Sequence, residues 1–138
     1  MTEPASNSTA SAELVVGKND LASALPLDGQ DAFPAVLATA RMVALMEIAS
    51  ARLLRSLLAD GELSVGVSID ATHSAPTPLG GKVTATARYV GREGKLFAFE
   101  IVATDASGEV GRARHKRAIV NAARLEGSAK RRIPARAT

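Results

Sequence analysis

Residues 39–58 read TARMVALMEIASARLLRSLL, and this stretch decides the fold. Successive residues of a helix advance by ~100°, and on such a wheel the apolar side chains fall in one arc with the arginines roughly opposite. The arc contains Thr39, Met42, Val43, Met46, Ala49, Ser50, Leu53, Leu54 and Leu57. The pattern predicts one amphipathic helix that starts near Pro34, where a missing N–H is harmless, and ends near Ala59, before the DG pair at 60 and 61.

Glu47 is the residue of this helix that amphipathicity does not explain. It falls on the edge of the apolar arc, away from Arg41, Arg52 and Arg55. Side chains pair along a helix at spacings of three and four, and at those spacings Glu47 meets only Val43, Ala44, Ser50 and Ala51. No lysine or arginine of the same helix can pair with it, so its partner lies elsewhere.

After the helix the apolar period changes from 3.6 to 2. In ELSVGVSIDATH (62–73), apolar residues at 63, 65, 67, 69 and 71 alternate with polar residues and glycine, and His73 continues the apolar set. This alternation predicts a strand with one buried face. Three further strands are predicted in KVTATARYV, KLFAFEIVAT and EVGRARHKRAIVN, separated by GREG and DASG turns, and a short one in ELVVG before the helix. The expected fold is α+β: one long helix on an antiparallel sheet of about five strands, with the last four strands in a meander.

The length of 138 residues suits one compact domain. Residues 1–12 are rich in small polar residues without apolar periodicity, and we expect a flexible N-terminal arm there. The folded domain is predicted over residues 13–125. Residues 126–138 are expected to form a basic, flexible C-terminal tail.

Composition excludes several classes of protein. With no cysteine, the chain has no disulfide, no thiolate metal site and no cysteine nucleophile, and we expect neither a metal nor a cofactor. No run of about 18 apolar residues could span a membrane, and the first residues have neither the basic start nor the apolar run of an export signal. We therefore expect a soluble, cytoplasmic protein.

Charge is divided unevenly along the chain. From Arg112 onward there are nine Lys or Arg against one acid, Glu126, a net charge of +8, whereas the other 111 residues carry eight basic and thirteen acidic side chains, a net charge of −5. A basic end on an acidic body indicates an anionic partner, either nucleic acid or a phosphorylated small molecule. Aromatics are only 3% and there is no recognition-helix motif, so nucleic acid is the less favoured partner.

Glu47 and His73 raise the same question from the helix and from the sheet. If the helix packs on the sheet face that includes Ile69, both side chains point into the layer between them. One interpretation is a buried structural pair, because single polar residues on apolar faces are usually hydrogen-bonded for packing reasons. The other adds Thr39: a carboxylate, an imidazole and a hydroxyl near one layer edge are what an acyl-transfer site needs. Spacing alone leaves both interpretations open.

The stretches FPAVLATARMVALMEIA, GVSIDATHSAPTPLGGKVT and HKRAIVN resemble the fluoroacetyl-CoA thioesterase family of hot-dog-fold proteins, from about Leu14 to Val120. The resemblance implies a helix wrapped by an antiparallel sheet, a homodimer with its site at the subunit interface, and hydrolysis of acyl-CoA thioesters. It implies catalytic roles for Thr39, Glu47 and His73, with His73 and the substrate as the partners of Glu47.

The resemblance also implies three substrate-binding residues. Gly66 would offer a backbone N–H to the thioester oxygen, Arg117 would lie near CoA, and Phe33 belongs to a lid before the helix. In the relative that selects fluoroacetyl-CoA this lid is rich in aromatic residues, but LASALPLDGQDAF contributes only Phe33. We therefore expect hydrolysis of another short acyl-CoA rather than selection for fluorine. The alternative is a non-catalytic hot-dog module that binds acyl-CoA or a protein partner.

Overall fold

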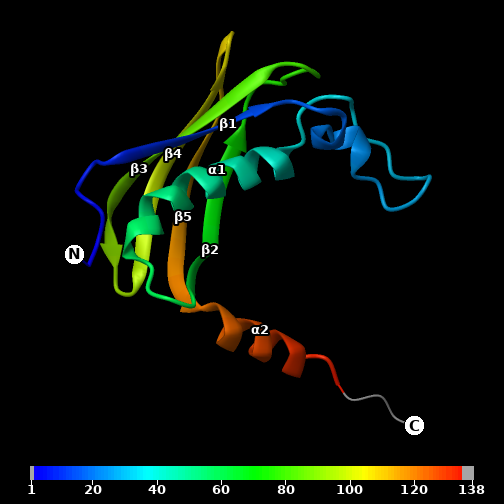
Figure 1. Ribbon diagram of the computed structural model, residues 1–138. Coiled ribbons are helices and arrows are strands. Elements are labelled where there is room, and N and C mark those ends of the chain that lie inside the picture. Colours follow the sequence, from blue (N-terminus) through cyan, green and yellow to red (C-terminus); the bar gives the residue numbers. More distant parts are fainter. Residues whose placement is uncertain (1, 135–138) are drawn as a thin grey trace.

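A helix lying across one face of a curled five-stranded sheet forms the body of the protein (Figure 1). The structure is a computed structural model that describes residues 2–134. All strand pairs are antiparallel, in the order β1-β3-β4-β5-β2. The elements are β1 (Thr9–Val15), α1 (Thr39–Leu54), β2 (Glu62–His73), β3 (Lys82–Glu93), β4 (Leu96–Asp105), β5 (Gly108–Asn121) and α2 (Ala122–Arg131), with short 3₁₀ turns at Lys18–Asp20, Ala22–Ala24 and Arg55–Leu57. The predicted α+β class is confirmed.

The apolar arc of α1 forms one side of the core, as its period predicts. Its buried residues are Met42, Leu45, Met46, Ala49, Ser50 and Leu54. The sheet side is lined largely by small residues, and these allow the helix to approach the backbone of β5 closely. A Cβ added at Gly111 would lie 2.6 Å from the Met42 sulfur. Tyr89 and Phe99, with ring centroids 5.7 Å apart, fill the centre of this aromatic-poor core.

The helix begins at Thr39, which is later than the predicted start near Pro34. The residues just before it are held by tertiary hydrogen bonds, since Leu37 N donates to Thr77 O over 2.8 Å and Ala38, which is extended, donates its N–H to Asp20 O over 2.9 Å. At its other end α1 passes into the 3₁₀ turn at Arg55–Leu57. Tertiary hydrogen bonds thus shorten the helix at its start.

A β-bulge between Gly66 and Ser68 interrupts the alternation predicted for β2. The extra residue, Val67, is 53% exposed, and Leu63 is 55% exposed. Both were predicted to face the core with Ile69. A bulge adds one residue to one strand and reverses the facing of everything beyond it, so Gly66 faces α1 instead.

The last four strands do not form a simple meander. Strands β3, β4 and β5 follow one another in the sheet, but β2 pairs with the far side of β5. The connection of β2 to β3, residues 74–81, contains two prolines and is too long for a tight turn. It crosses over to place β3 three strands away, which leaves β2 at a free edge.

Both ends of the chain contain more structure than predicted. Strand β1 begins at Thr9, inside the expected arm, because residues 9–15 pair with β3. Helix α2 occupies half of the expected tail; its first turn is capped by Asn121, whose Oδ1 accepts from Arg124 N over 2.9 Å, and it extends away from the sheet (Figure 1). Residue 1 of the predicted arm and residues 135–138 of the predicted tail lie outside the described residues. None of the helices over residues 2–134 has the length and apolar character needed to cross a membrane.

Candidate active site

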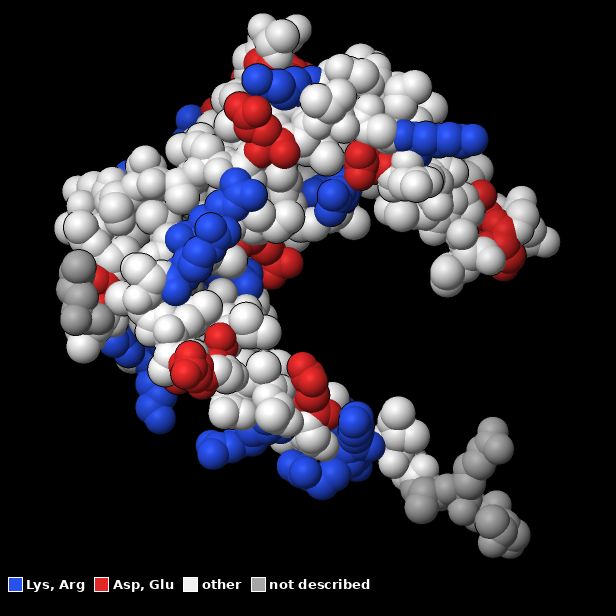
Figure 2. Space-filling view, in the orientation of Figure 1, with Lys and Arg blue, Asp and Glu red and all other residues white. Residues whose placement is uncertain are grey.

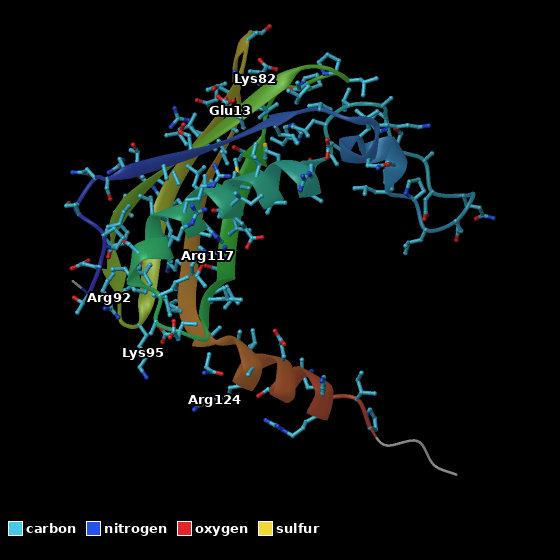
Figure 3. The ribbon with its side chains drawn as sticks, in the orientation of Figure 1. Glu13, Lys82, Arg92, Lys95, Arg117 and Arg124 are labelled. Atoms are coloured by element: carbon cyan, nitrogen blue, oxygen red, sulfur yellow. The ribbon has the colours of Figure 1, made fainter. Side chains whose placement is uncertain are left out.

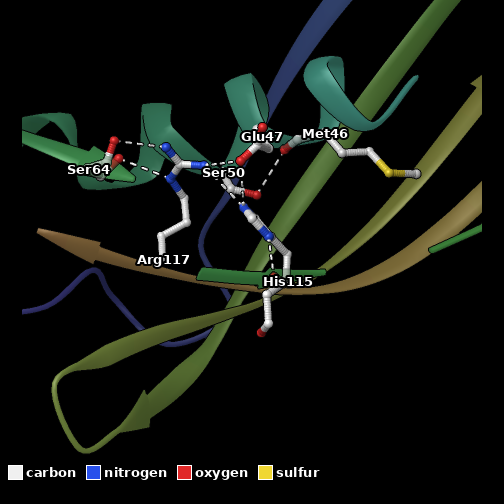
Figure 4. Close-up of polar contacts among 7 residues, drawn as sticks. Met46, Glu47, Ser50, Ser64, His115 and Arg117 are labelled. Atoms are coloured by element: carbon white, nitrogen blue, oxygen red, sulfur yellow. Dashed lines mark hydrogen bonds and ion pairs between the residues drawn. The ribbon is translucent and has the colours of Figure 1, made fainter. Parts of the chain in front are cut away.

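Glu47 finds its partner on the sheet. Arg117, from β5, places Nη1 3.1 Å from Glu47 Oε1 (Figure 4). The guanidinium is held from a second side by β2, since Nε donates to Ser64 Oγ over 3.0 Å and Nη2 donates to Ser64 O over 2.9 Å. The side chain of Glu47 is 39% exposed and that of Arg117 only 8%. The carboxylate therefore meets the surface while its cation lies beneath it.

His115 completes this cluster in a form that the hydrogen bonds specify. Its Nδ1 lies 2.8 Å from Ser68 O, and a carbonyl only accepts, so Nδ1 carries the hydrogen. Its Nε2 lies 3.1 Å from Arg117 Nη1, and a guanidinium only donates, so Nε2 accepts. His115 is thus a neutral imidazole of defined tautomer.

Burial acts on the two basic groups of the cluster in the same direction. Burial lowers the pKa of His115, and the Arg117 cation lowers it further, while the hydrogen bond to Ser68 and the Glu47 carboxylate oppose this. Burial also lowers the pKa of Arg117, and Glu47 opposes that change. The lowered pKa of His115 agrees with the neutral form that the hydrogen bonds require.

Gly66 lies directly against the carboxylate. A Cβ at this position would sit 2.1 Å from Glu47 Oε1 and 3.2 Å from His115 Cε1. Real atoms do not approach so closely, so only glycine leaves room here for the carboxylate. The side chain that lies against Gly66 in this structure is that of Glu47; the role of its N–H toward a thioester oxygen stays a prediction.

Thr39 and His73 form a second polar group. Thr39 is the first residue of α1, and its Oγ1 lies 2.8 Å from Nδ1 of His73 at the end of β2. The other ring nitrogen, His73 Nε2, is buried without a hydrogen-bond partner among the described residues. Orphaned buried polar atoms are uncommon and call for an explanation.

The two polar groups are separate within one chain. Thr39 and Glu47 are eight residues apart on α1, or about 12 Å along the helix axis at 1.5 Å per residue. The cation paired with the Glu47 carboxylate among residues 2–134 is Arg117, and the neutral His115 places Nε2 3.9 Å from it; His73, the predicted partner, is hydrogen-bonded to Thr39 instead. A helix of this pitch places positions 39 and 47 on one side but two turns apart, so His73, next to Thr39, cannot also reach Glu47.

The sequence pattern missed His115 and Ser64. Alternation along β5 does place His115 on the same face as Arg117, and burial confirms this, but a histidine beside an arginine in a basic strand reads as surface charge. Alternation along β2 predicts Ser64 on the polar face, because the pattern gives no sign of the bulge. Phe33, in the loop before α1, is 52% exposed.

A family model described as fluoroacetyl-CoA-specific thioesterase matches residues 16–123. The chain belongs to this family. It is 38% identical over 103 residues to the fluoroacetyl-CoA thioesterase of Streptantibioticus cattleyicolor, covering 75% of this chain and 74% of the relative. The predicted family is thereby confirmed.

Solved structures agree with this membership. The fluoroacetyl-CoA thioesterase FlK superposes with a TM-score of 0.85 at 31% identity, covering 94% of this chain and 97% of FlK. A threonine-to-alanine variant of FlK in complex with fluoroacetate gives 0.87 at 30% identity, covering 94% and 98%. A thioesterase superfamily member from Thermus thermophilus gives 0.83 at 26% identity, covering 95% and 94%. The hot-dog fold predicted from the sequence is confirmed.

Proposed function

We propose that this member of the family hydrolyses short-chain acyl-CoA thioesters to the free acid and CoA. The observation that carries the proposal is the arrangement at Glu47. Its carboxylate lies at the surface beside Gly66, and Arg117 beneath it provides the compensating charge. A carboxylate fixed in this way next to a strand backbone is placed to act on a carbonyl bound there.

The proposed reaction uses Glu47 on one side of the thioester and the Thr39–His73 pair on the other. Glu47 takes a proton from a water molecule, whose oxygen attacks the thioester carbon while the Gly66 N–H stabilises the developing oxyanion. The C–S bond then breaks, and the departing thiolate takes a proton from His73, which enters the cycle as the imidazolium and is oriented by Thr39. The proton that Glu47 took from water returns to His73 through solvent, which restores both groups. Direct attack by Glu47, followed by hydrolysis of the resulting anhydride, is the alternative route.

A homodimer would bring the two polar groups together. The structure has an open hollow between the loop before α1 and α2 (Figure 2), and exposed apolar side chains lie on the surrounding elements: Phe33, Ile48, Leu63, Val67 and Leu125. The edge strand β2 lies on this same side of the sheet (Figure 1). We propose that a second copy covers this surface by a two-fold axis that passes α1 near Val43, halfway between Thr39 and Glu47. Glu47 of one subunit would then face Thr39 and His73 of the other.

The CoA phosphates need cations at the mouth of this site. Arg117 lies between β5 and α1, whereas Arg92 and Lys95 lie where β3 turns into β4 and Arg124 lies on α2 (Figure 3). Four N–H groups of Arg117 already have partners out of the five that an arginine carries. Its predicted contact with CoA stays a prediction, and its burial favours the task of holding Glu47. Arg117→Ala distinguishes the two roles. If Arg117 binds a CoA phosphate, the substitution should raise KM for acyl-CoA much more than for a short acyl thioester without phosphates. If Arg117 holds Glu47 in place, the substitution should impair hydrolysis of both substrates alike.

A panel of acyl-CoA thioesters tests the function. We expect turnover of short acyl chains, with no strong preference for the fluorinated one, since Phe33 is the single aromatic residue of the loop before α1. Glu47→Gln and His73→Ala should each lower kcat by at least ~10²-fold with unchanged circular dichroism. Binding of acyl-CoA without turnover by the wild-type protein would instead support the non-catalytic module.

A further inference from the structure

The sheet face that points away from α1 plays no part in the proposed site, and one row of side chains crosses it from edge to edge. The strand registers place Thr9, Arg88, Glu100, Arg114 and Asp70 side by side on β1, β3, β4, β5 and β2. From β3 to β2 the formal charges therefore run plus, minus, plus, minus. The neighbouring row, which contains Val102 and Arg112, shows no such alternation.

The row lies in a depression. A shallow hollow of about 530 Å³ is lined by all five residues of the row, together with Val102 and Arg112. The hollow lies among the side chains that stand on this outer face of the sheet. A surface with an ordered pattern of charge can bind a partner whose charges follow the complementary order.

Charge in the row is only half neutralised within the chain. Arg88 forms an ion pair with Glu100. Arg114 and Asp70 are cross-strand neighbours, yet neither takes part in an ion pair among residues 2–134. One cation and one anion of the row are thus available to an outside partner.

Read in the opposite direction, the row has the opposite sign at every position, so it is complementary to a second copy of itself turned end to end. We propose that two copies of the protein stack through this outer face about a two-fold axis that runs along the strands between β4 and β5. Such an axis reverses the row of the partner, so that Arg88 faces the second copy's Asp70 and Glu100 faces its Arg114. All four contacts of the row then join opposite charges. This proposal does not depend on the proposed function.

Other features of the face agree with this axis and argue against a two-fold axis that runs along the row. Val102 faces Arg112 of the second copy, so the aliphatic part of an arginine covers an apolar side chain. An axis along the row would instead place each charge on its own copy, which costs repulsion at every position. Stacked sheets lie about 10 Å apart and cross at roughly 30°. Arginine side chains are long enough to reach across this gap and to compensate for the sideways shift that the crossing produces.

The experiment uses two single charge reversals. The contact tested is that between position 88 of one copy and position 70 of the other. In Arg88→Asp both of its residues are acidic, and in Asp70→Arg both are basic, so each variant alone should fail to stack. An equimolar mixture restores every contact, because the acidic face of one variant meets the basic face of the other. Sedimentation at about 10 mM salt, where the Debye length is about 30 Å, should give a larger mass for the wild type and the mixture than for each variant alone.

Two further proteins complete the test. Arg88→Asp/Asp70→Arg should stack with itself; the two positions are three strands apart, roughly 14 Å, so they cannot restore each other within one chain. Glu13→Lys is the matched control: it changes charge by the same amount on the same face, but on β1, outside the overlap, and should behave as the wild type. Equal masses for the wild type and Asp70→Arg, or a mixture that stays at the smaller mass, would overturn the proposal. Circular dichroism establishes that each variant is folded.

Discussion

His115 can accept a hydrogen bond from Arg117 only while its imidazole is neutral. Protonation would place a hydrogen on Nε2 and a second positive charge 3.1 Å from Nη1 of the guanidinium. The buried position already disfavours that charge. The orientation of Arg117, and through it that of Glu47, therefore depends on the protonation of a residue that does not reach the surface.

This dependence predicts a loss of stability in mild acid. The fold lowers the pKa of His115 below the value of about 6.5 in an unfolded chain, so the unfolded state binds more protons between the two values. The free energy of unfolding should therefore fall as the pH drops below about 6.5. In His115→Asn the amide can still donate to Ser68 O but does not titrate, and the slope of unfolding free energy against pH should flatten. Denaturant unfolding from about pH 7.5 to pH 5 measures both slopes; parallel curves would contradict the assignment.

The polar residues themselves were predictable, but their pairing was not. Glu47 and His73 stand out as polar residues on apolar patterns, and the absence of a partner for Glu47 on its own helix points to the sheet. The sequence pattern does not say which residue of the sheet pairs with Glu47. That choice depends on how far along α1 each strand crosses, and the crossing places Arg117 at Glu47 and His73 at Thr39.

At the level of elements, the bulge in β2 brings Gly66 to the carboxylate. Periodicity located β2 to β5 to within a few residues, because each has a clear alternation bounded by turns. A bulge leaves no such trace, since its extra residue, Val67, is itself apolar. The start of α1 and the pairing of β2 also escaped prediction, because both depend on contacts between residues distant in sequence.

Gly66→Ala tests the consequence of the bulge. The added methyl group would overlap Glu47 Oε1, so the carboxylate must move away from the strand. We expect kcat to fall by about 10²-fold, as for a catalytic group displaced by about 1 Å, while the fold persists. Gly29→Ala is the control, because a Cβ there meets nothing within 4 Å. Steady-state kinetics of the two variants should differ strongly; equal activity would mean that Glu47 tolerates displacement.

At the scale of the whole molecule, the separation of the two polar groups predicts a site shared between subunits. A purified heterodimer of Glu47→Gln with His73→Ala would hold one fully intact site and one doubly impaired site. We expect about half of the wild-type activity per dimer from two inactive parents. A homodimer of either variant would hold two impaired sites.

The matched control is a heterodimer of the wild type with the double variant Glu47→Gln/His73→Ala. If each site takes residues from both chains, both of its sites are impaired and it should be inactive. If each chain holds its own site, the first heterodimer should be inactive and this control should keep about half of the wild-type activity. A monodisperse, fully active monomer at micromolar concentration would contradict the homodimer itself.

The contact of Glu3 with Tyr89 gives the protein an internal optical probe. Tyr89 is the single tyrosine of a chain without tryptophan, and its hydroxyl donates to the Glu3 carboxylate. Burial and this carboxylate raise the pKa of Tyr89 from 10.0 to about 12. The folded state thus keeps the phenol protonated where an unfolded chain would ionise it, and this stabilisation is complete below about pH 10 and disappears as the pH approaches 12. The ultraviolet absorbance of one phenolate therefore reports the folding of the whole sheet in alkali, without a label.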